Sequence, residues 1–245
     1  MNALEIRGLT KRRGDFALQG LDLTLPAGCI MGLIGENGAG KSTTIRLILN
    51  ALSRDGGTVA VYGKDNRALT PLEREDIGAV LDEVGLPEYM TARQIGRMMA
   101  GIFARWQPEV YRDYLRRLAL PEDKTFRDFS RGMKMKLGLA AALSQQPKLL
   151  LLDEHTAALD PATAEKVLEL TRRVVVESHI TCLMVTHNMH QALELGNRTL
   201  MMADGHIVLD VAGSERAGMG VDDLIARFKA GAGHELDNDR ILLSE

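Results

Sequence analysis

The stretch GENGAGKSTT, residues 35 to 44, constrains the fold more than any other part of this chain. It places three glycines within six positions and follows them with a lysine and three hydroxyl residues. A short apolar run, CIMGLI (29–34), precedes it, as in a strand that is buried on both faces. From 45 to 52 the apolar residues recur at helical spacing, so the sequence predicts a buried strand, an open loop and an amphipathic helix.

The spacing Gly-x-x-x-x-Gly-Lys-Ser is typical of a loop that surrounds a phosphate. Glycines permit the dihedral angles that turn successive backbone N–H groups inward, and the helix N-terminus adds its dipole. A glycine-rich turn without a ligand would not explain the lysine and the serine together. We therefore expect a nucleotide to be bound by Gly35, Glu36, Asn37, Gly38, Ala39, Gly40, Lys41, Ser42 and Thr43.

Polar residues follow two other apolar runs, which we interpret as strands. Asp153 and Glu154 come after LLLL, and His187 comes after LMVT. Ligands of parallel sheets collect at the carboxyl ends of strands, so these side chains are expected near the loop. Asp153 and Ser42 are then candidates for holding Mg²⁺, and Glu154 for polarising an attacking water. His187 is a candidate for sensing the terminal phosphate.

Composition excludes several classes of function. The 245 residues carry a formal net charge of −3, which argues against sequence-independent binding of nucleic acid. No run of 18 apolar residues occurs, so direct insertion into a membrane is not expected, and the charged N-terminus is not that of a secretory signal. The two cysteines, Cys29 and Cys182, lie in apolar runs and are expected to be buried thiols in a reducing compartment.

The pattern along the chain predicts the α/β class with a largely parallel sheet, because strands alternate with helices. Strands are expected at 4–9, 16–25, 29–34, 56–63, 148–152 and 180–186, with a hairpin at 199–210; helices are expected at 161–177 and 188–196. Residues about 86–145 are rich in Met, Arg and Leu and predict an inserted helical lobe. We expect one domain over 1–212 and a tail over 213–245 that contains one short helix, at 221–228.

With these motifs, FSRGMKMKLGLA (129–140) makes the chain resemble the ATP-binding-cassette (ABC) ATPases over residues 1 to about 212. This segment, about 20 residues before Asp153, is similar to the family signature LSGGQ. The resemblance implies a P-loop NTPase (RecA-like) core, an N-terminal antiparallel β subdomain and an inserted α-helical subdomain. It also implies ATP and Mg²⁺ as cofactors. No guanine-reading NKxD motif is found.

The same resemblance implies a homodimer or heterodimer of ATPase subunits in which each ATP lies between the loop of one subunit and the signature of the other. The signature residues that would face the partner's γ-phosphate are Ser130, Arg131, Gly132 and Met133. Asp160 matches the loop that crosses the dimer interface in the family.

The chain departs from the family pattern at several positions. Arg131 replaces a glycine and Met133 a glutamine, and Asp82 stands where a glutamine usually reaches the metal. Asp82 could still hold Mg²⁺ through water, whereas Arg131 could either approach the phosphate or face solvent. Arg13 stands where a tyrosine often stacks on adenine; arginine also stacks on flat rings, and Phe16 is close by, so either could serve.

The two halves of the chain resemble ATPases of two different kinds of transporter. The first 145 residues are similar to exporter-type ATPases, whereas the sequence from LLLLDEHTAALDP onward is similar to ATPases of binding-protein-dependent importers. The direction of transport and the cargo therefore stay open.

The function that these features favour is an ATPase subunit at the cytoplasmic face of the membrane, peripheral to it, which drives a separate permease. A permease helix would dock on the helical lobe, where the candidates are Tyr89, Met90, Met98, Met99, Phe103 and Trp106. One alternative is a non-transport ABC-type ATPase, but the coiled-coil insertion or second cassette of such proteins is missing. A metabolite kinase or GTPase would leave FSRGM unexplained. A nucleotide-binding switch with impaired hydrolysis stays possible if the departures disable turnover.

Overall fold

The computed structural model describes residues 1–156 and 159–232, which form two compact units. The first unit combines residues 1–69 with the chain from Thr181 onward, and the second comprises residues 70–180. Residues 233–245 of the predicted tail lie outside the described residues. None of the helices in the described ranges has the length and apolar character needed to span a bilayer.

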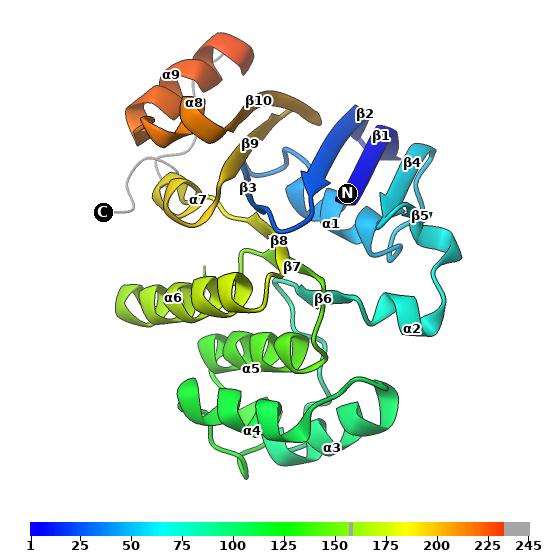
Figure 1. The fold of residues 1–245 in the computed structure, drawn as a ribbon, viewed down its shortest axis with the longest axis vertical. Helices are drawn as coiled ribbons and strands as arrows, with labels where there is room; N and C mark the ends of the chain where they lie inside the picture. Colours follow the sequence, from blue (N-terminus) through cyan, green and yellow to red (C-terminus); the bar gives the residue numbers. More distant parts are fainter. Residues whose placement is uncertain (157–158, 233–245) are drawn as a thin grey trace. The chain divides into compact units, whose positions relative to one another are not determined.

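An antiparallel sheet begins the first unit, with the strand order β2-β1-β4-β5 (Figure 1). Its strands are β1 (Asn2–Arg13), β2 (Phe16–Pro26), β4 (Gly56–Val61) and β5 (Lys64–Asp65). At the tip of the first hairpin Arg13 pairs with Phe16. Leu4 and Val59 are fully buried on one face of this sheet, which explains the alternation of apolar and polar residues.

Three parallel strands and one antiparallel strand form the rest of the described sheet structure of the first unit. β3 (Ile30–Gly35) lies between β8 (Thr181–Val185) and β9 (Arg198–Ala203) and is parallel to both, and β10 (His206–Ala212) pairs antiparallel with β9. Every residue of β8 is buried, as expected for a parallel strand covered on two faces. These pairings confirm the predicted α/β class.

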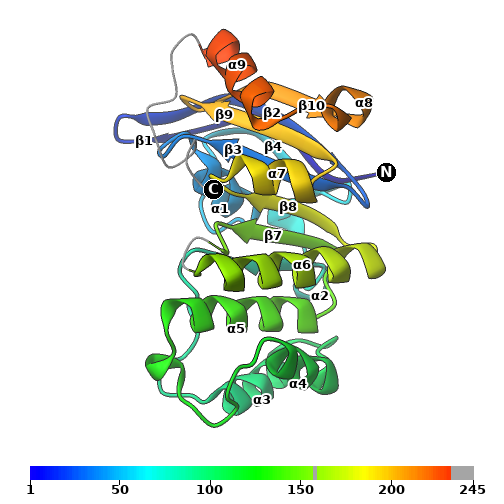
Figure 2. The same ribbon diagram turned by 90° about the vertical axis from the view of Figure 1, so that its left-hand side faces the viewer.

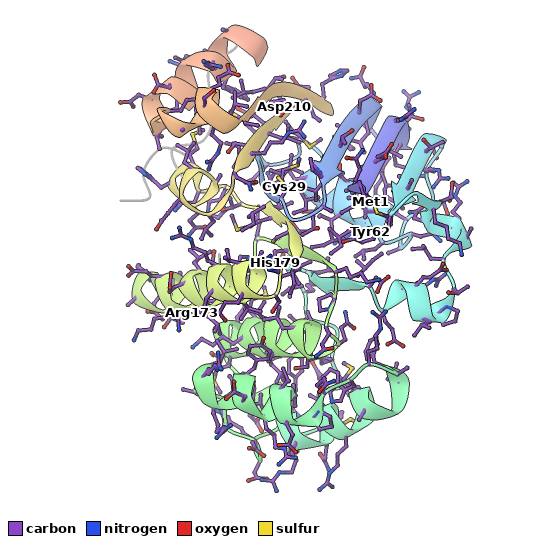
Figure 3. All side chains as sticks on the ribbon, in the orientation of Figure 1. Met1, Cys29, Tyr62, Arg173, His179 and Asp210 are labelled. Atoms are coloured by element: carbon purple, nitrogen blue, oxygen red, sulfur yellow. The ribbon has the colours of Figure 1, made fainter. Side chains whose placement is uncertain are left out.

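Both cysteines are free thiols beside the pair β3–β8. Cys29, labelled in Figure 3, precedes β3. It is half-buried, so the expectation of two buried thiols is wrong for this residue. Cys182 in β8 is buried, and its backbone N–H donates to the Cys29 carbonyl over 3.0 Å. Burial raises the pKa of the Cys182 thiol to about 12 and also raises that of Cys29.

Helices cover this sheet. α1 (Lys41–Ile48) follows the glycine-rich loop, and the buried amide of Asn66, in the short 3₁₀ turn η1 (Asn66–Ala68), donates to the Leu47 and Ile48 carbonyls at its end. α7 (Met189–Leu195) begins at Asn188, whose side chain accepts from the Gln191 N–H over 3.0 Å. Amide side chains therefore satisfy backbone carbonyls at the end of α1 and a backbone N–H at the start of α7.

The chain after residue 212 contains more helix than the sequence predicted. Where one short helix was expected, the described part of this range has two, α8 (Gly213–Ala217) and α9 (Val221–Ala232), next to α7 and β10 (Figure 1). Leu224 and Phe228 of α9 are fully buried in one cluster with Ile34 and Met201 of the sheet. This helix therefore belongs to the core of the first unit.

The second unit contains the parallel pair β6 (Ile77–Val80) and β7 (Leu149–Asp153). The short helix α2 (Pro71–Arg74) precedes β6, and α6 (Pro161–Glu177) follows β7 with the bounds that the sequence predicted. The four leucines of β7 are fully buried, which accounts for the apolar run before Asp153.

Three helices lie within the stretch that was predicted to be helical. They are α3 (Ala92–Ile102), α4 (Pro108–Arg117) and α5 (Arg131–Ser144), and a 3₁₀ turn, η2 (Phe126–Asp128), precedes α5. α3 and α4 pack against α5 (Figure 2). α3 starts with a capping box formed by Thr91 and Gln94. Gly96 lets the two outer helices approach closely, because a Cβ there would lie 2.5 Å from Cε1 of Tyr111.

Candidate functional site

The loop between β3 and α1 can be built only with glycine at defined points. Gly35, Gly38 and Gly40 have φ angles of 150°, 87° and 106°, in the region that side chains disfavour. A Cβ on Gly35 would lie 2.2 Å from the Met202 carbonyl oxygen, whereas a Cβ on Gly38 would meet nothing within 4 Å. Gly35 is therefore required because the backbone of Met202 packs closely against it, whereas Gly38 is required only for its φ angle.

Lys41, the first residue of α1, is held by the loop that precedes it. Its side chain is 5% exposed, and Nζ donates to the carbonyls of Gly35 over 2.7 Å and Glu36 over 2.9 Å. Ser42 and Thr43 are half-buried in the same first turn, where the helix N-terminus provides backbone donors. The first turn of α1 thus carries the ammonium of Lys41 and the hydroxyls of Ser42 and Thr43, directly after the loop that contains Asn37 and Ala39.

His187 lies beside this loop at the same edge of the sheet. Leu33 of β3 pairs with Val185 of β8 in parallel register, so Gly35 and His187 both follow that pair by two residues. The Thr186 N–H donates to the Leu33 carbonyl over 3.2 Å, which continues the pairing to the strand ends. The first unit therefore brings His187 and the loop together, as the pattern of strand ends predicted.

The two candidates for adenine contact differ in position. Phe16 is half-buried and its ring lies against the loop, because a Cβ on Gly40 would be 2.8 Å from Phe16 Cζ. Arg13, its partner across the hairpin, is exposed at the tip. Of the two, Phe16 is the residue that contacts the loop backbone.

In the second unit the acidic pair ends β7. Asp153 is the last residue of the strand and is 3% exposed, and Glu154 after it is half-buried with φ of 48°. A left-handed backbone is uncommon for a residue other than glycine and is often found at functional sites. This backbone conformation changes the direction of the chain at Glu154, the residue predicted to activate water.

His155 is the next residue and is fully enclosed. It is 2% exposed, its Nε2 has no hydrogen-bond partner among the described residues, and burial lowers its pKa to about 4. The imidazole is therefore neutral near pH 7. Nothing in the sequence indicated that this histidine would be buried.

Asp82 belongs to the end of the neighbouring strand. Val80 of β6 pairs with Leu152 of β7, so Asp82 and Glu154 follow that pair by two residues each. Asp82 is exposed, and its Oδ1 accepts a hydrogen bond from Nη2 of Arg131 over 2.6 Å. In this structure the Arg131 guanidinium lies against Asp82 of its own chain, a contact that neither of the two alternatives for Arg131 had named.

The signature segment forms the N-terminus of α5. Ser130 is the N-cap, and its Oγ accepts from the Met133 N–H over 3.2 Å. Its hydroxyl hydrogen stays able to donate elsewhere. Gly132 lies in the first turn, where the backbone N–H groups have no acceptor within the helix. Residues 130–133 thus present a hydroxyl and backbone donors at one helix end.

Asp160 is the N-cap of α6. Its Oδ1 accepts from the Thr163 N–H over 3.0 Å, and the hydrogen bonds from Thr163 lower the pKa of its carboxyl. The side chain is fully ionised near neutral pH and begins the helix that follows β7. A role at a subunit interface stays a prediction for this residue.

The chain matches a family model described as ABC transporter over residues 18–157. It is 32% identical over 251 residues to the daunorubicin/doxorubicin resistance ATP-binding protein DrrA of Streptomyces peucetius, covering 99% of this chain and 75% of that protein. It is 36% identical over 212 residues to the aliphatic sulfonates import ATP-binding protein SsuB 2 of Agrobacterium fabrum, covering 85% and 79%. The predicted mixture of two kinds of relative is confirmed.

Solved structures are similar in fold. A dimeric post-hydrolysis state of the ATP-binding cassette MJ0796 with ADP and Pi gives a TM-score of 0.76 at 22% identity, over 85% of this chain and 98% of that one. The structure of cbiO1 from Clostridium perfringens gives 0.74 at 24% identity, over 94% and 95%. At these identities the likeness shows the fold alone, and it confirms the predicted P-loop NTPase class.

Proposed function

The chain belongs to the ABC transporter family, and from this premise we propose that it is the ATP-binding and ATP-hydrolysing subunit that energises a separate transmembrane permease. The observation that carries the proposal is the loop before α1. Three glycines with left-handed φ and the buried ammonium of Lys41 converge at one helix N-terminus, an arrangement suited to a chain of phosphates. The relatives DrrA and SsuB 2 are likewise named as ATP-binding proteins.

In this proposal the loop and Lys41 hold the phosphates, with Phe16 rather than Arg13 beside the base. Ser42 and Asp153 are oxygen donors of the kind that Mg²⁺ prefers, so these residues fit the metal. Mg²⁺ supplies charge neutralisation on the phosphates when it is bound. Asp82 would join through water only when its carboxylate is not held by Arg131.

Glu154 is proposed to orient and deprotonate the attacking water, and His187 to donate a hydrogen bond to the terminal phosphate. The left-handed backbone at Glu154 supports a specialised position for this carboxylate. His187 ends a strand parallel to β3 at the level of Gly35, which supports its role beside the loop. ATP turnover tests both roles.

We further propose that two ATPase subunits pair, as a homodimer or a heterodimer, with the N-terminus of α5 facing the partner's nucleotide. The hydroxyl of Ser130 and the N–H groups near Gly132 would contact the γ-phosphate, with Arg131 and Met133 beside them. Asp160 would lie near the interface. Dimers are known for the cassette MJ0796, which shares the fold.

A groove of about 310 Å³ in the second unit is the proposed docking site for a permease helix at the cytoplasmic face of the membrane. Its walls come from β6, the loop after it, α3 and α5, and its apolar lining includes Val80, Val84, Leu86, Met99 and Phe103. Met99 and Phe103 were candidates for this contact from the sequence. Such a groove accepts the apolar face of an amphipathic helix.

The test is ATP turnover of the purified protein, alone and with the permease purified alongside it. We expect Glu154→Gln to bind ATP with unchanged affinity, to hydrolyse it at least about a hundredfold more slowly, and to accumulate a dimer with ATP. The matched control is Glu165→Gln, an exposed residue of α6, which should keep the parent's rate. Equal turnover by Glu154→Gln and the parent would remove Glu154 from the mechanism.

Binding is tested separately from hydrolysis. Lys41→Ala removes the cation at the start of α1 and should weaken Mg·ATP binding by about tenfold or more, because a charge-assisted hydrogen bond to phosphate is lost. Unchanged affinity would count against the phosphate-binding loop. A parent that binds ATP but never hydrolyses it, with or without permease, would instead identify a nucleotide-binding switch.

A further inference from the structure

A second cavity lies in the helical part of the second unit and shares no lining residue with the proposed permease groove, although Trp106, a candidate for permease contact from the sequence, lines it. It has a volume of about 540 Å³ and is formed by one face of α3, the N-terminal half of α4 and the segments that flank them. Its lining consists of Arg93, Gly96, Arg97, Ala100, Trp106, Pro108, Tyr111, Arg112, Leu115 and Glu122. Cavities of this size with a mostly apolar wall and a few polar groups are typical of small-molecule sites.

The wall of the cavity is aromatic and carries an unsatisfied donor. The rings of Trp106 and Tyr111 lie with centroids 5.1 Å apart, and Leu115 packs below them, fully buried. The Tyr111 hydroxyl donates to the Ala92 carbonyl over 2.9 Å, so its polar group is satisfied. The indole N–H of Trp106 is buried and has no acceptor among the described residues, which is unusual for a buried tryptophan.

The charges of the lining are not balanced. Arg93 bonds to Glu122 over 3.2 Å, which also neutralises the one carboxylate of the lining. Arg112 bonds to Glu109 over 2.5 Å. The side chain of Arg97 on α3 has neither an ion pair nor a hydrogen bond within the part of the chain that the structure describes. One guanidinium at the cavity is therefore available to an anion, and it presents planar donors that suit a carboxylate or sulfonate.

We propose that this cavity binds a small amphipathic anion, with a flat apolar body against Trp106 and Tyr111 and a carboxylate or sulfonate on Arg97. Ala100 leaves its part of the α3 wall without a bulky side chain, whereas at Gly96 the Tyr111 ring already lies close to the helix, so the ring system of the ligand would lie beside Ala100. An acceptor atom on the ligand is the candidate partner for the indole N–H. The proposal concerns a site within residues 93–122 and does not depend on ATP hydrolysis.

The experiment uses anilinonaphthalene sulfonate, an aromatic anion, and N-phenylnaphthylamine, its uncharged counterpart. Trp106 is the only tryptophan of the chain, so its emission reports directly on the cavity wall. We expect anilinonaphthalene sulfonate to quench Trp106 emission saturably in the full-length native protein, and to bind more tightly than the uncharged compound. Saturation distinguishes one site from the diffuse dye binding of loosened states.

Two variants separate charge from shape. Arg97→Gln should lower the affinity for anilinonaphthalene sulfonate by about tenfold, the loss expected for one charge-assisted hydrogen bond, and should leave N-phenylnaphthylamine unchanged. Ala100→Phe, at an exposed position of α3, should block both compounds by filling the cavity. The matched control is Arg116→Gln on α4, an exposed arginine outside the lining, which should change neither affinity.

Each variant is first shown to be folded by its thermal midpoint, and the substitutions lie at exposed positions where folding tolerates them. The proposal is overturned if the anion does not quench Trp106 saturably, if Arg97→Gln binds the anion as the parent does, or if Ala100→Phe leaves binding intact. Equal affinities for the charged and the uncharged compound would also overturn it, because Arg97 would then not favour the anion.

Discussion

Nη2 of Arg131, in the first turn of α5, donates to Oδ1 of Asp82, in the loop after β6, over 2.6 Å. Both positions depart from the family pattern, which has neutral residues there. The two side chains that depart from it are opposite in charge and form an ion pair with each other. The loop after β6 and the signature helix are therefore linked within one chain.

This link should contribute little to stability, because its side chains are 67% and 50% exposed. A double-mutant cycle with Arg131→Gln and Asp82→Asn should give a coupling of about 0.2–1 kcal/mol in the free energy of unfolding, falling with added salt. Urea denaturation measures it. The exposed pair Arg173–Glu169 on α6 is the matched control and should give a similar value. A coupling of zero at low salt would show that the contact is not formed in solution.

The glycines of the loop before α1 should differ in their cost of substitution. Gly35→Ala places a Cβ 2.2 Å from a backbone oxygen that cannot swing away, so we expect a loss of about 3 kcal/mol or more in the free energy of unfolding. Gly38→Ala meets no atom within 4 Å and keeps only the strain of φ at 87°, so about 1 kcal/mol should be lost. Equal losses in thermal unfolding would contradict the packing of Gly35 on Met202.

The sequence predicted most of the elements because their patterns are local. The start of α6 could be predicted from Asp160 and Pro161, which cap and begin the helix. The loop of residues 35–42 could be predicted from its glycines and from the helix that follows it. β6 and α8 were missed because four and five residues are too few to show a period. The site could be located by its motifs. The contact between Arg131 and Asp82 could not be predicted, because it joins side chains 49 positions apart through the fold.

The two thiols should differ in reactivity. The thiolate is the nucleophile, and burial raises the pKa of Cys182 to about 12, so little thiolate forms there between pH 7 and 9. Its rate of alkylation by iodoacetamide should be far below that of half-buried Cys29, and both rates should rise with pH, because both pKa values lie above their ordinary values.

Mass spectrometry after a short exposure to iodoacetamide should find Cys29 modified and Cys182 protected. Cys29→Ser supplies the control, since this variant should remain unmodified until it is unfolded in urea. Rapid labelling of Cys182 in the native protein would contradict its burial in β8.

Helix α9 should be essential for the stability of the first unit. Phe228→Ala removes a fully buried ring from the cluster with Ile34 and Met201, and a loss of about 3–5 kcal/mol in the free energy of unfolding is expected. Arg227→Ala, one residue earlier and exposed, should cost less than about 1 kcal/mol. Similar thermal midpoints for Phe228→Ala and the parent would mean that this helix does not hold the sheet.

The hydrogen bonds of Lys41 to the Gly35 and Glu36 carbonyls affect the rate and the affinity of nucleotide binding. A free lysine side chain loses up to about 2 kcal/mol of rotamer entropy when it is immobilised. Here that ordering accompanies folding, so an incoming triphosphate meets a cation that is already in position. Attraction between charges, and not the immobilisation of a flexible chain, then governs the association step.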